Sequence, residues 1–193
     1  SLRFAICAPT GKAAARLGAA LSAAAASLDS MSAVRSRFPT EASTIHRLLG
    51  YRNRRFIFNA TNPLPADVVV VDEASMIDLA LMAHLIAAVP PEARLIILGD
   101  HHQLSSVEAG AVLGDICQGT TPGLHAADLL AVLRQLGLKP PPEHMSNRLR
   151  VSPLSDNVVI LTRNYRFSGE RGIGALVEAV KRGDGQLVRA LFT

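Results

Sequence analysis

The stretch VVVVDEAS, residues 68–75, decides the fold of this chain. Four consecutive β-branched residues without a polar residue among them are typical of a strand buried on both faces of a parallel sheet. Asp72 and Glu73 follow directly, at the end of the strand where parallel sheets bind ligands. One carboxylate can hold Mg²⁺ while the other orients or deprotonates a water, as nucleoside triphosphate hydrolysis requires. The structural alternative is an Asp that caps a following helix, with a Glu in its first turn.

The composition is that of a globular domain. The chain has 193 residues, of which 49% are hydrophobic and 19% charged, enough for one domain with its own core. Its net charge of +4 permits a polyanionic partner without requiring one. Cys7 and Cys117 lie far apart and form no metal or redox spacing, which favours a cytoplasmic protein. No stretch predicts a membrane span, and a first residue other than Met suggests a segment of a longer protein.

Strands alternate with helices along the chain. This order predicts an α/β fold with a mostly parallel sheet flanked by helices. Aromatic residues and the closing Asn-Pro-Leu-Pro favour a small hairpin within residues 51–62, and prolines favour an exposed connection at residues 139–153. We expect strands at residues 4–8, 68–71, 94–98 and 158–161, and helices at 12–28, 44–49, 79–88, 110–117, 126–136 and 173–181.

Three of the expected strands lead into polar residues. Asp72 and Glu73 follow the second, Gly99 to Gln103 follow the third, and residues 162–166 follow the last. Parallel strands share one carboxyl edge, so these side chains should converge on a site for a polyphosphate and Mg²⁺. Surface salt bridges are the alternative for Arg163 and Arg166, and the capping of a helix is the alternative for Gln103.

A triphosphate site of this class also needs a glycine-rich loop that ends in Gly-Lys-Ser or Gly-Lys-Thr. Gly11 and Lys12 supply a Gly-Lys pair, but Ile6 stands where the first glycine belongs and Ala13 follows the lysine. We therefore expect no phosphate loop within these residues.

Five stretches together carry a resemblance to a known family. The stretches are APTGKAAARL at 8–17, STIHRLLG at 43–50, VVDEASMID at 70–78, GDHHQLSSVEAG at 99–110 and LTRNYRF at 161–167. They resemble consecutive motifs of superfamily 1 DNA helicases, and among these the RecD type, the alpha subunit of exodeoxyribonuclease V. The resemblance implies a RecA-like P-loop NTPase fold that lacks its P-loop segment, with residues 1–193 forming part of the first motor domain.

The resemblance assigns roles in ATP hydrolysis. It implies that Asp72 holds Mg²⁺ and that Glu73 is the general base or positions the water. Gln103 resembles a γ-phosphate sensor, and Arg166 resembles the arginine that neutralises charge in the transition state. Tyr165 resembles a residue that stacks on adenine, with core packing as its alternative.

The resemblance also assigns a DNA face. Thr10, Gly11 and Lys12 match a motif that grips the strand backbone, and a helix start does expose N–H groups to an anion. Thr44 and His46 match the next strand-contacting motif. An ordinary strand-to-helix turn is the alternative for the first motif, and a packed or capping His is the alternative for His46.

Residues 44–66 contain four arginines and no acid, with Tyr51, Phe56 and Phe58 between them. Positive charge with stacking rings holds single strands without sequence preference. A solvated hairpin is the alternative. By resemblance, residues 51–62 with Arg52, Arg54 and Arg55 form the pin that separates a duplex.

The family implies an ATP-driven motor that moves 5′ to 3′ on single-stranded DNA and unwinds duplexes in double-strand-break repair. Its partners would be DNA and the RecB and RecC subunits, without a membrane. A non-catalytic single-strand-binding module and a P-loop NTPase without nucleic acid are the alternatives. Without the phosphate loop, the isolated chain should be inactive.

Overall fold

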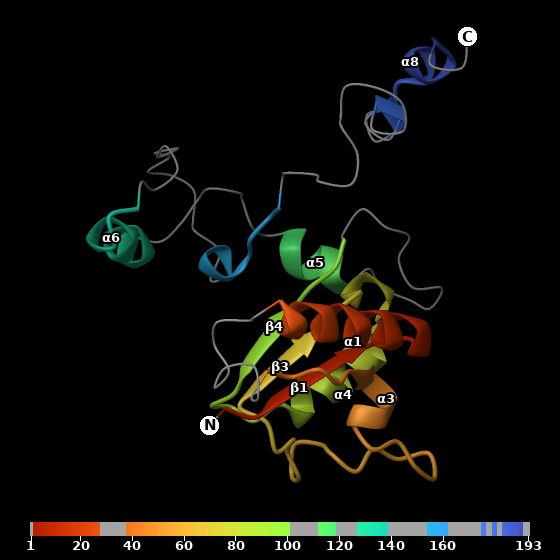
Figure 1. The fold of residues 1–193 in the computed structure, drawn as a ribbon, viewed down its shortest axis with the longest axis vertical. Coiled ribbons are helices and arrows are strands. Elements are labelled where there is room, and N and C mark those ends of the chain that lie inside the picture. The colour runs from red at the N-terminus through yellow and green to blue at the C-terminus, as the bar shows by residue number, and fades with distance from the viewer. Residues whose placement is uncertain are drawn as a thin grey trace. The chain divides into compact units, whose positions relative to one another are not determined.

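The structure is a computed structural model that describes residues 2–27, 38–100, 112–118, 127–138, 154–161, 175–176, 179–180 and 183–190. The chain divides into two compact units, Ser1–Gly119 and Thr120–Thr193. The first unit holds the sheet and the helices that pack on it (Figure 1). Among the described residues, no helix is long and apolar enough to cross a membrane.

A four-stranded parallel sheet forms the centre of the first unit. Its strands are β1 (Phe4–Ala8), β2 (Ser43–Thr44), β3 (Val68–Val71) and β4 (Arg94–Ile97), in the order β2-β1-β3-β4. Phe4 pairs with Val68, and Val68 pairs in turn with Arg94. The strands therefore end at one edge, and the predicted parallel α/β sheet is confirmed.

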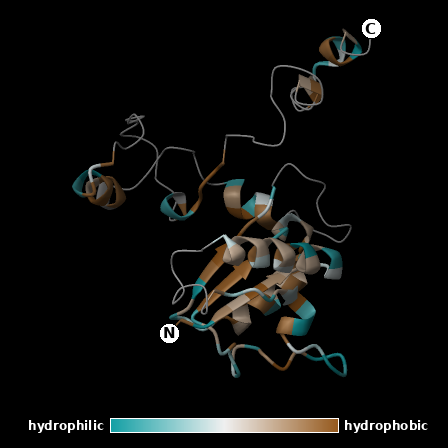
Figure 2. Cartoon of the chain, viewed as in Figure 1, coloured by the Kyte–Doolittle hydropathy of each residue, from teal (hydrophilic) through white to brown (hydrophobic). Residues whose placement is uncertain are grey.

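Helices pack on both faces of this sheet. Helix α1 (Gly11–Ala26) crosses one face and α4 (Leu79–Ala88) lies behind the other (Figure 1). Val69 and Val71 are fully buried and belong to one core cluster with Met82 and Leu85 of α4. Fully burying a side chain of this kind contributes about 1.5–3 kcal/mol. In Figure 2 the strands have the brown colour of hydrophobic residues, whereas the alanine-rich α1 is paler.

Side-chain caps begin three helices at defined residues. Thr10 Oγ1 accepts a hydrogen bond from the N–H of Ala13 at the start of α1, at 3.2 Å. Thr44 Oγ1 does the same for the N–H of Arg47 in α3 (Ile45–Leu48), also at 3.2 Å. Asp78 Oδ1 accepts from the N–H of Leu81 in α4, at 2.8 Å. Such a cap contributes about 1 kcal/mol, so these three polar side chains fix the starts of their helices.

An ion pair joins β1 and β3 at the edge opposite their carboxyl ends. The guanidinium of Arg3 donates to Asp67, with 2.9 Å between Nη2 and Oδ1, and the backbone N–H of Arg3 donates to Asp67 Oδ2 at 2.7 Å. These hydrogen bonds lower the pKa of Asp67 to about 2. In the same sheet, burial raises the pKa of the Cys7 thiol to about 12, so Cys7 is a packing residue at neutral pH.

In the second unit, one predicted strand is wrong and one helix is present that the sequence did not predict. It contains α6 (Ala127–Gln135) and α8 (Gly185–Ala190). Residues 158–161 form no strand, because no described strand pairs with them, and Val159 and Leu161 are 81% and 90% exposed. The sequence did not predict α8, because Gly183 and Gly185 resemble helix breakers. Asp184 Oδ1 offsets them by accepting from the N–H of Leu187 at 3.0 Å.

The remaining predicted elements are confirmed to within a few residues where they are described. Helix α5 (Val112–Gln118) packs Val112 and Leu113 into the core of the first unit. Of the helix expected at residues 173–181, only 175–176 and 179–180 are described, and these are helical. The proline-rich connection at residues 139–153 lies outside the described residues.

Candidate functional site

Asp72 continues β3 by one residue beyond its last valine. Its backbone N–H donates to the carbonyl of Cys7 in β1, at 2.9 Å. Its side-chain Oδ1 accepts from the backbone N–H of Glu73, also at 2.9 Å, and both residues are half-buried. One oxygen of the carboxylate therefore holds the turn, and Oδ2 makes no hydrogen bond within the described residues. Asp72 thus presents an oxygen at the carboxyl edge of the sheet.

Glu73 has a backbone conformation that is rare for a residue with a side chain. Its φ of 53° and ψ of 38° lie in the left-handed region, which costs roughly 1–3 kcal/mol unless the surrounding structure enforces it. It leads into a 3₁₀ turn, η1 (Ala74–Met76), whose first N–H donates to the carbonyl of Leu98 at 2.9 Å. Asp78, and not Asp72, caps the next α-helix, so the helix-cap alternative for Asp72 is wrong.

Gly99 allows the end of β4 to lie against this turn. A Cβ atom at position 99 would come within 2.6 Å of Leu113 Cδ2 and within 3.1 and 3.2 Å of the backbone nitrogens of Ser75 and Ala74. A side chain would therefore push β4 away from η1. Two of the three expected strand ends, those of β3 and β4, are thus adjacent in the structure.

The residues at this edge fit Mg²⁺ with a nucleoside triphosphate. Mg²⁺ is usually held by one or two carboxylates, with waters and substrate phosphates completing its shell. Asp72 and Glu73 supply two carboxylates at this edge, and no group of three or more potential metal-binding His, Cys, Asp or Glu side chains occurs among the described residues. Ser75 Oγ is buried beside them and lacks a hydrogen-bond partner within the same residues. An unsatisfied buried hydroxyl is costly, which suits a site that a further oxygen completes.

Several predicted residues of the ATP site cannot be placed. Gln103, Arg163, Tyr165 and Arg166 lie outside the described residues. Their roles, and the convergence of a third strand end on this site, stay predictions.

The residues predicted to grip the DNA backbone lie at the ends of neighbouring strands. Ala8 pairs with Thr44, so the turn at Thr10 and the start of α3 share one edge of the sheet. Lys12 and Gly11 are exposed at the start of α1. A Cβ atom on Gly11 would meet no atom within 4 Å, so packing does not require glycine there. Open space above a helix N-terminus favours the close approach of an anion.

The segment 51–62 differs from the single hairpin that we expected. It contains two successive tight turns, closed by isolated antiparallel bridges between Arg52 and Arg55 and between Asn59 and Asn62. The physical reason is local hydrogen bonding, because Asn59 Oδ1 accepts from the N–H of Thr61 at 2.9 Å and so starts a turn of its own. The segment is therefore not a pair of strands, and its assignment as an inserted pin stays a prediction.

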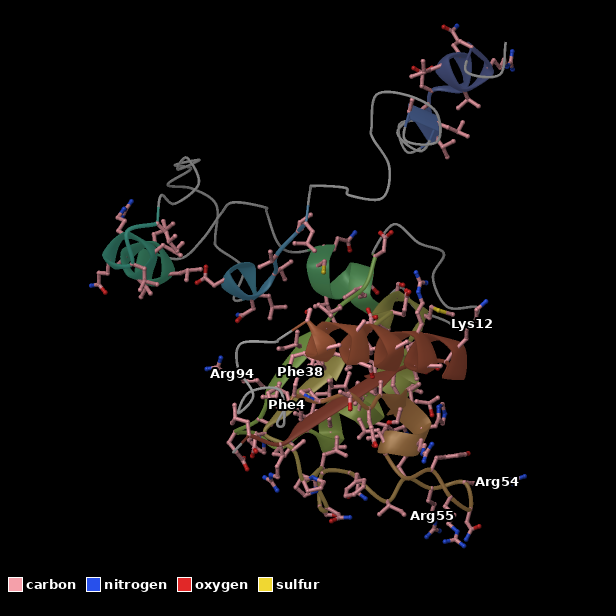
Figure 3. The ribbon with its side chains drawn as sticks, in the orientation of Figure 1. Phe4, Lys12, Phe38, Arg54, Arg55 and Arg94 are labelled. Atoms are coloured by element: carbon pink, nitrogen blue, oxygen red, sulfur yellow. The ribbon has the colours of Figure 1, made fainter. Side chains whose placement is uncertain are left out.

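Exposed arginines occupy the first of these turns. Asn53 and Arg54 have φ angles of 51° and 59°, as the two central residues of a type I′ turn do. Arg52, Arg54 and Arg55 are exposed. Arg54 and Arg55 point away from the sheet, and Arg94 lies at the opposite edge (Figure 3).

A cluster of rings lies beneath these arginines. His46 contacts Tyr51 at a centroid distance of 5.4 Å, and Tyr51 contacts Phe56 at 4.9 Å. Phe56 contacts His84 of α4 at 4.7 Å. The sequence did not single out His84, although an exposed His on an otherwise apolar helix was a usable signal.

Comparisons with known proteins agree with this geometry. A family model described as an AAA domain matches residues 2–158. The chain is 43% identical over 188 residues to the RecBCD enzyme subunit RecD of Haemophilus influenzae, covering 94% of the chain and 29% of that protein. The Mycobacterium tuberculosis protein of the same name is 42% identical over 191 residues, covering 98% and 28%. The ATP-dependent RecD2 DNA helicase of Deinococcus radiodurans is 45% identical over 117 residues, covering 61% and 14%.

The chain belongs to the AAA domain family, and its parallel sheet with flanking helices is a RecA-like α/β fold. Within this fold it is similar to helicases of the RecD type, so the resemblance predicted from the five motifs is confirmed. The chain spans 29%, 28% and 14% of the lengths of these three relatives.

Proposed function

We propose that this chain couples ATP to DNA within a helicase that moves along single-stranded DNA and unwinds duplexes. The proposal rests on one observation, which is that the residues proposed for the nucleotide and those proposed for DNA lie at the same edge of the sheet. Asp72 and Glu73 follow β3, Thr10 follows the end of β1, and Thr44 is the last residue of β2. A nucleotide and a DNA backbone bound at neighbouring strand ends are close enough for one to move the other.

The two carboxylates would have different roles in ATP hydrolysis. The site would take Mg²⁺ with ATP, and the bound ion would supply charge neutralisation for the phosphates. Asp72 would hold the ion through Oδ2, directly or through water. Glu73 would position the attacking water and accept its proton, a contribution of about 10²–10⁴ in rate. The left-handed backbone of Glu73 aims its side chain differently from an extended continuation of β3.

On the DNA side, cations and helix starts hold the sugar–phosphate backbone. Thr10, Gly11 and Lys12 would bind phosphates at the start of α1, with Thr44 and His46 beside them. Arg52, Arg54 and Arg55 would add positive charge, in the segment proposed as the pin. Contacts of this kind bind without sequence preference and weaken steeply with salt.

Strand binding tests the DNA side. Fluorescence anisotropy of the chain with a labelled single strand should give a dissociation constant that rises steeply with salt concentration. A variant with Ala at positions 52, 54 and 55 should bind more weakly and with a smaller salt slope. Arg94→Ala is the matched control, because Arg94 is exposed at the opposite edge of the sheet. An unchanged affinity and slope in the triple variant would exclude a DNA role for these arginines.

ATP hydrolysis tests the proposed role of the two carboxylates, and it is measured in the protein that contains this chain. Glu73→Gln should lower its DNA-stimulated ATP hydrolysis by about 10²–10⁴-fold, while binding of a fluorescent ATP analogue is retained. The isolated chain contains no Gly-Lys-Ser or Gly-Lys-Thr loop and should hydrolyse ATP poorly or not at all. ATP turnover by the pure chain that Glu73→Gln abolishes would overturn this last expectation.

The proposal extends to the biological setting. We propose a cytoplasmic role in double-strand-break repair and recombination, with movement 5′ to 3′ and with RecB and RecC subunits as partners, by similarity to the RecBCD subunits named above. Because the chain itself has no phosphate loop, a non-catalytic single-strand-binding module is the second candidate. Helicase activity of the carrying protein that depends on Asp72 and Glu73 would exclude this second candidate.

A further inference from the structure

A pocket of about 580 Å³ lies beside the turn at residues 52–55, and the proposed function gives its interior no ligand. Binding sites for small molecules commonly have volumes of about 300–1,000 Å³. Its walls come from α3, from the segment after α3, and from α4 with its capping residue Asp78. The lining includes four rings, those of His46, Tyr51, Phe56 and His84.

The rings contact one another in a series, and these contacts leave parts of the ring faces uncovered. The Tyr51 and Phe56 rings are inclined at 49°, and the Phe56 and His84 rings at 48°. Neither pair is stacked face to face, so the pairs leave ring faces that a further planar group can cover. Tyr51 is 50% exposed, although its body is apolar. Tyr51 therefore has ring surface that the neighbouring rings leave uncovered at the pocket.

Backbone hydrogen bonds hold the walls of the pocket in place. The N–H of Tyr51 donates to the carbonyl of His46 at 2.8 Å, and the N–H groups of Ile57 and Phe58 both donate to the carbonyl of Leu49 at 3.1 Å. Leu49 is fully buried in the core. The rings therefore stand on a fixed base, which lowers the entropic cost of stacking a ligand on them.

The charge at the rim matches a nucleotide. Arg54 and Arg55 line the pocket together with one carboxylate, that of Asp78. Asp78 Oδ1 accepts from the N–H of Leu81, so this carboxylate is partly occupied in capping α4. Two guanidinium groups against one carboxylate leave the rim positive, as a phosphate next to a stacked base requires.

We propose that this pocket accepts one base of the bound single strand. The base stacks on Tyr51 and His84, while the adjoining phosphates lie against Arg54 and Arg55. This inference rests on the proposed DNA role and adds a ring-lined subsite to it. His46 then contributes a wall of the pocket. Every base has a π-face, so the subsite tolerates any sequence, with larger purines covering more ring area.

Strands with and without bases test this subsite in the chain. Tyr51→Ala and His84→Ala should each weaken binding of an ordinary single strand by roughly 5- to 150-fold, the factor that corresponds to about 1–3 kcal/mol per stacked base. The salt slope should stay that of the unmodified chain, because neither substitution removes a cation that contacts phosphate. Tyr51→Phe, which keeps the ring, should bind as the unmodified chain does.

An abasic strand of equal length separates stacking from charge. Its affinity should be the same for the unmodified chain, Tyr51→Ala and His84→Ala, whereas the triple arginine variant should bind it more weakly. A 2-aminopurine placed in the strand should lose fluorescence on binding the unmodified chain and recover it with Tyr51→Ala. Far-UV circular dichroism checks that the variants fold, and His84, being exposed, supplies a second variant that leaves the core intact.

The outcomes distinguish the two proposals. A chain that does not bind single strands overturns the proposed DNA role and this subsite with it. A chain that binds with a steep salt slope, but equally well as Tyr51→Ala and His84→Ala, overturns the subsite alone. Equal losses for ordinary and abasic strands in Tyr51→Ala would also overturn it, since stacking needs a base.

Discussion

Asp72 Oδ1 accepts a 2.9 Å hydrogen bond from the backbone N–H of Glu73, so one acidic residue holds the turn that positions the other. The two oxygens of this side chain can therefore have separate roles. Oδ1 supports the left-handed backbone of Glu73. Oδ2 makes no hydrogen bond within the described residues and is the oxygen proposed to hold Mg²⁺. Substitutions that keep one role and remove the other should behave differently in folding and in function.

Asp72→Asn and Asp72→Ala should separate these roles. Asn retains an oxygen acceptor for the N–H of Glu73, so its free energy of unfolding should stay within about 0.5 kcal/mol of the original. Ala removes that acceptor and should lower the free energy of unfolding by about 0.5–1.5 kcal/mol. Both variants lose the charge for Mg²⁺, so both should abolish ATP turnover in the carrying protein. Urea unfolding and ATPase assays measure the two effects, and Asn-variant ATPase near the original level would contradict the metal role.

Gly99→Ala should destabilise the first unit through a steric conflict. The new methyl group would meet Leu113 at 2.6 Å and the backbone of η1 at 3.1 Å. Overpacking of this kind typically costs about 1–3 kcal/mol. Leu113→Ala in the same chain should recover part of the loss, because it removes the nearer clash and leaves the backbone contact. A double-mutant cycle by urea unfolding measures the coupling, and additive effects would argue against this contact.

Gly11→Ala should separate folding from DNA binding. Space around position 11 is open, and Ala is a better helix residue than Gly, so the free energy of unfolding should rise by about 0.4–1 kcal/mol. If the strand backbone approaches Gly11 closely, single-strand affinity should fall in the same variant. Gly185→Ala, at another helix start with open space, is the matched control and should leave affinity unchanged. A variant that is more stable and binds DNA normally would exclude the close approach.

The pairing of Arg3 with Asp67 should appear as a pH dependence of stability. The pKa of Asp67 is lowered from 3.8 to about 2 in the folded chain, chiefly by hydrogen bonds from Arg3. Its stabilising contribution is therefore complete above about pH 4 and is lost as the pH falls through about 2. The effect should be small, since the side chains are 63% and 34% exposed.

Urea midpoints at several pH values between 5 and 2 test this. The difference between the original chain and Asp67→Asn should shrink as the pH falls. Glu92→Gln is the control, because Glu92 is exposed and makes no hydrogen bond or ion pair in the described part of the chain. A difference that stays constant down to pH 2 would show that Arg3 does not hold the Asp67 carboxylate.

Local sequence was sufficient for most elements of the first unit, although the short strand β2 (Ser43–Thr44) was not among the expected strands. The valine run at residues 68–71 predicts a buried strand because β-branched side chains on both faces need a covered sheet. Thr44 and Asp78 mark helix starts because their oxygens accept the N–H groups that a first turn leaves open. Local sequence was insufficient at residues 158–161, since a strand also needs a partner edge, and none of the described strands supplies one.

The sequence by itself determined the class of protein and pointed to Asp72 and Glu73 as the carboxylates proposed for an ATP site, because the order of the motifs and the strand ends can be read along the chain. Only the tertiary structure decided the left-handed turn at Glu73, the contact of Gly99 with η1, and the meeting of His84 with Tyr51 and Phe56 around one pocket. The physical reason is that hydrophobic periodicity specifies which face of an element is buried. It does not specify which distant element covers that face, and these three features depend on that choice.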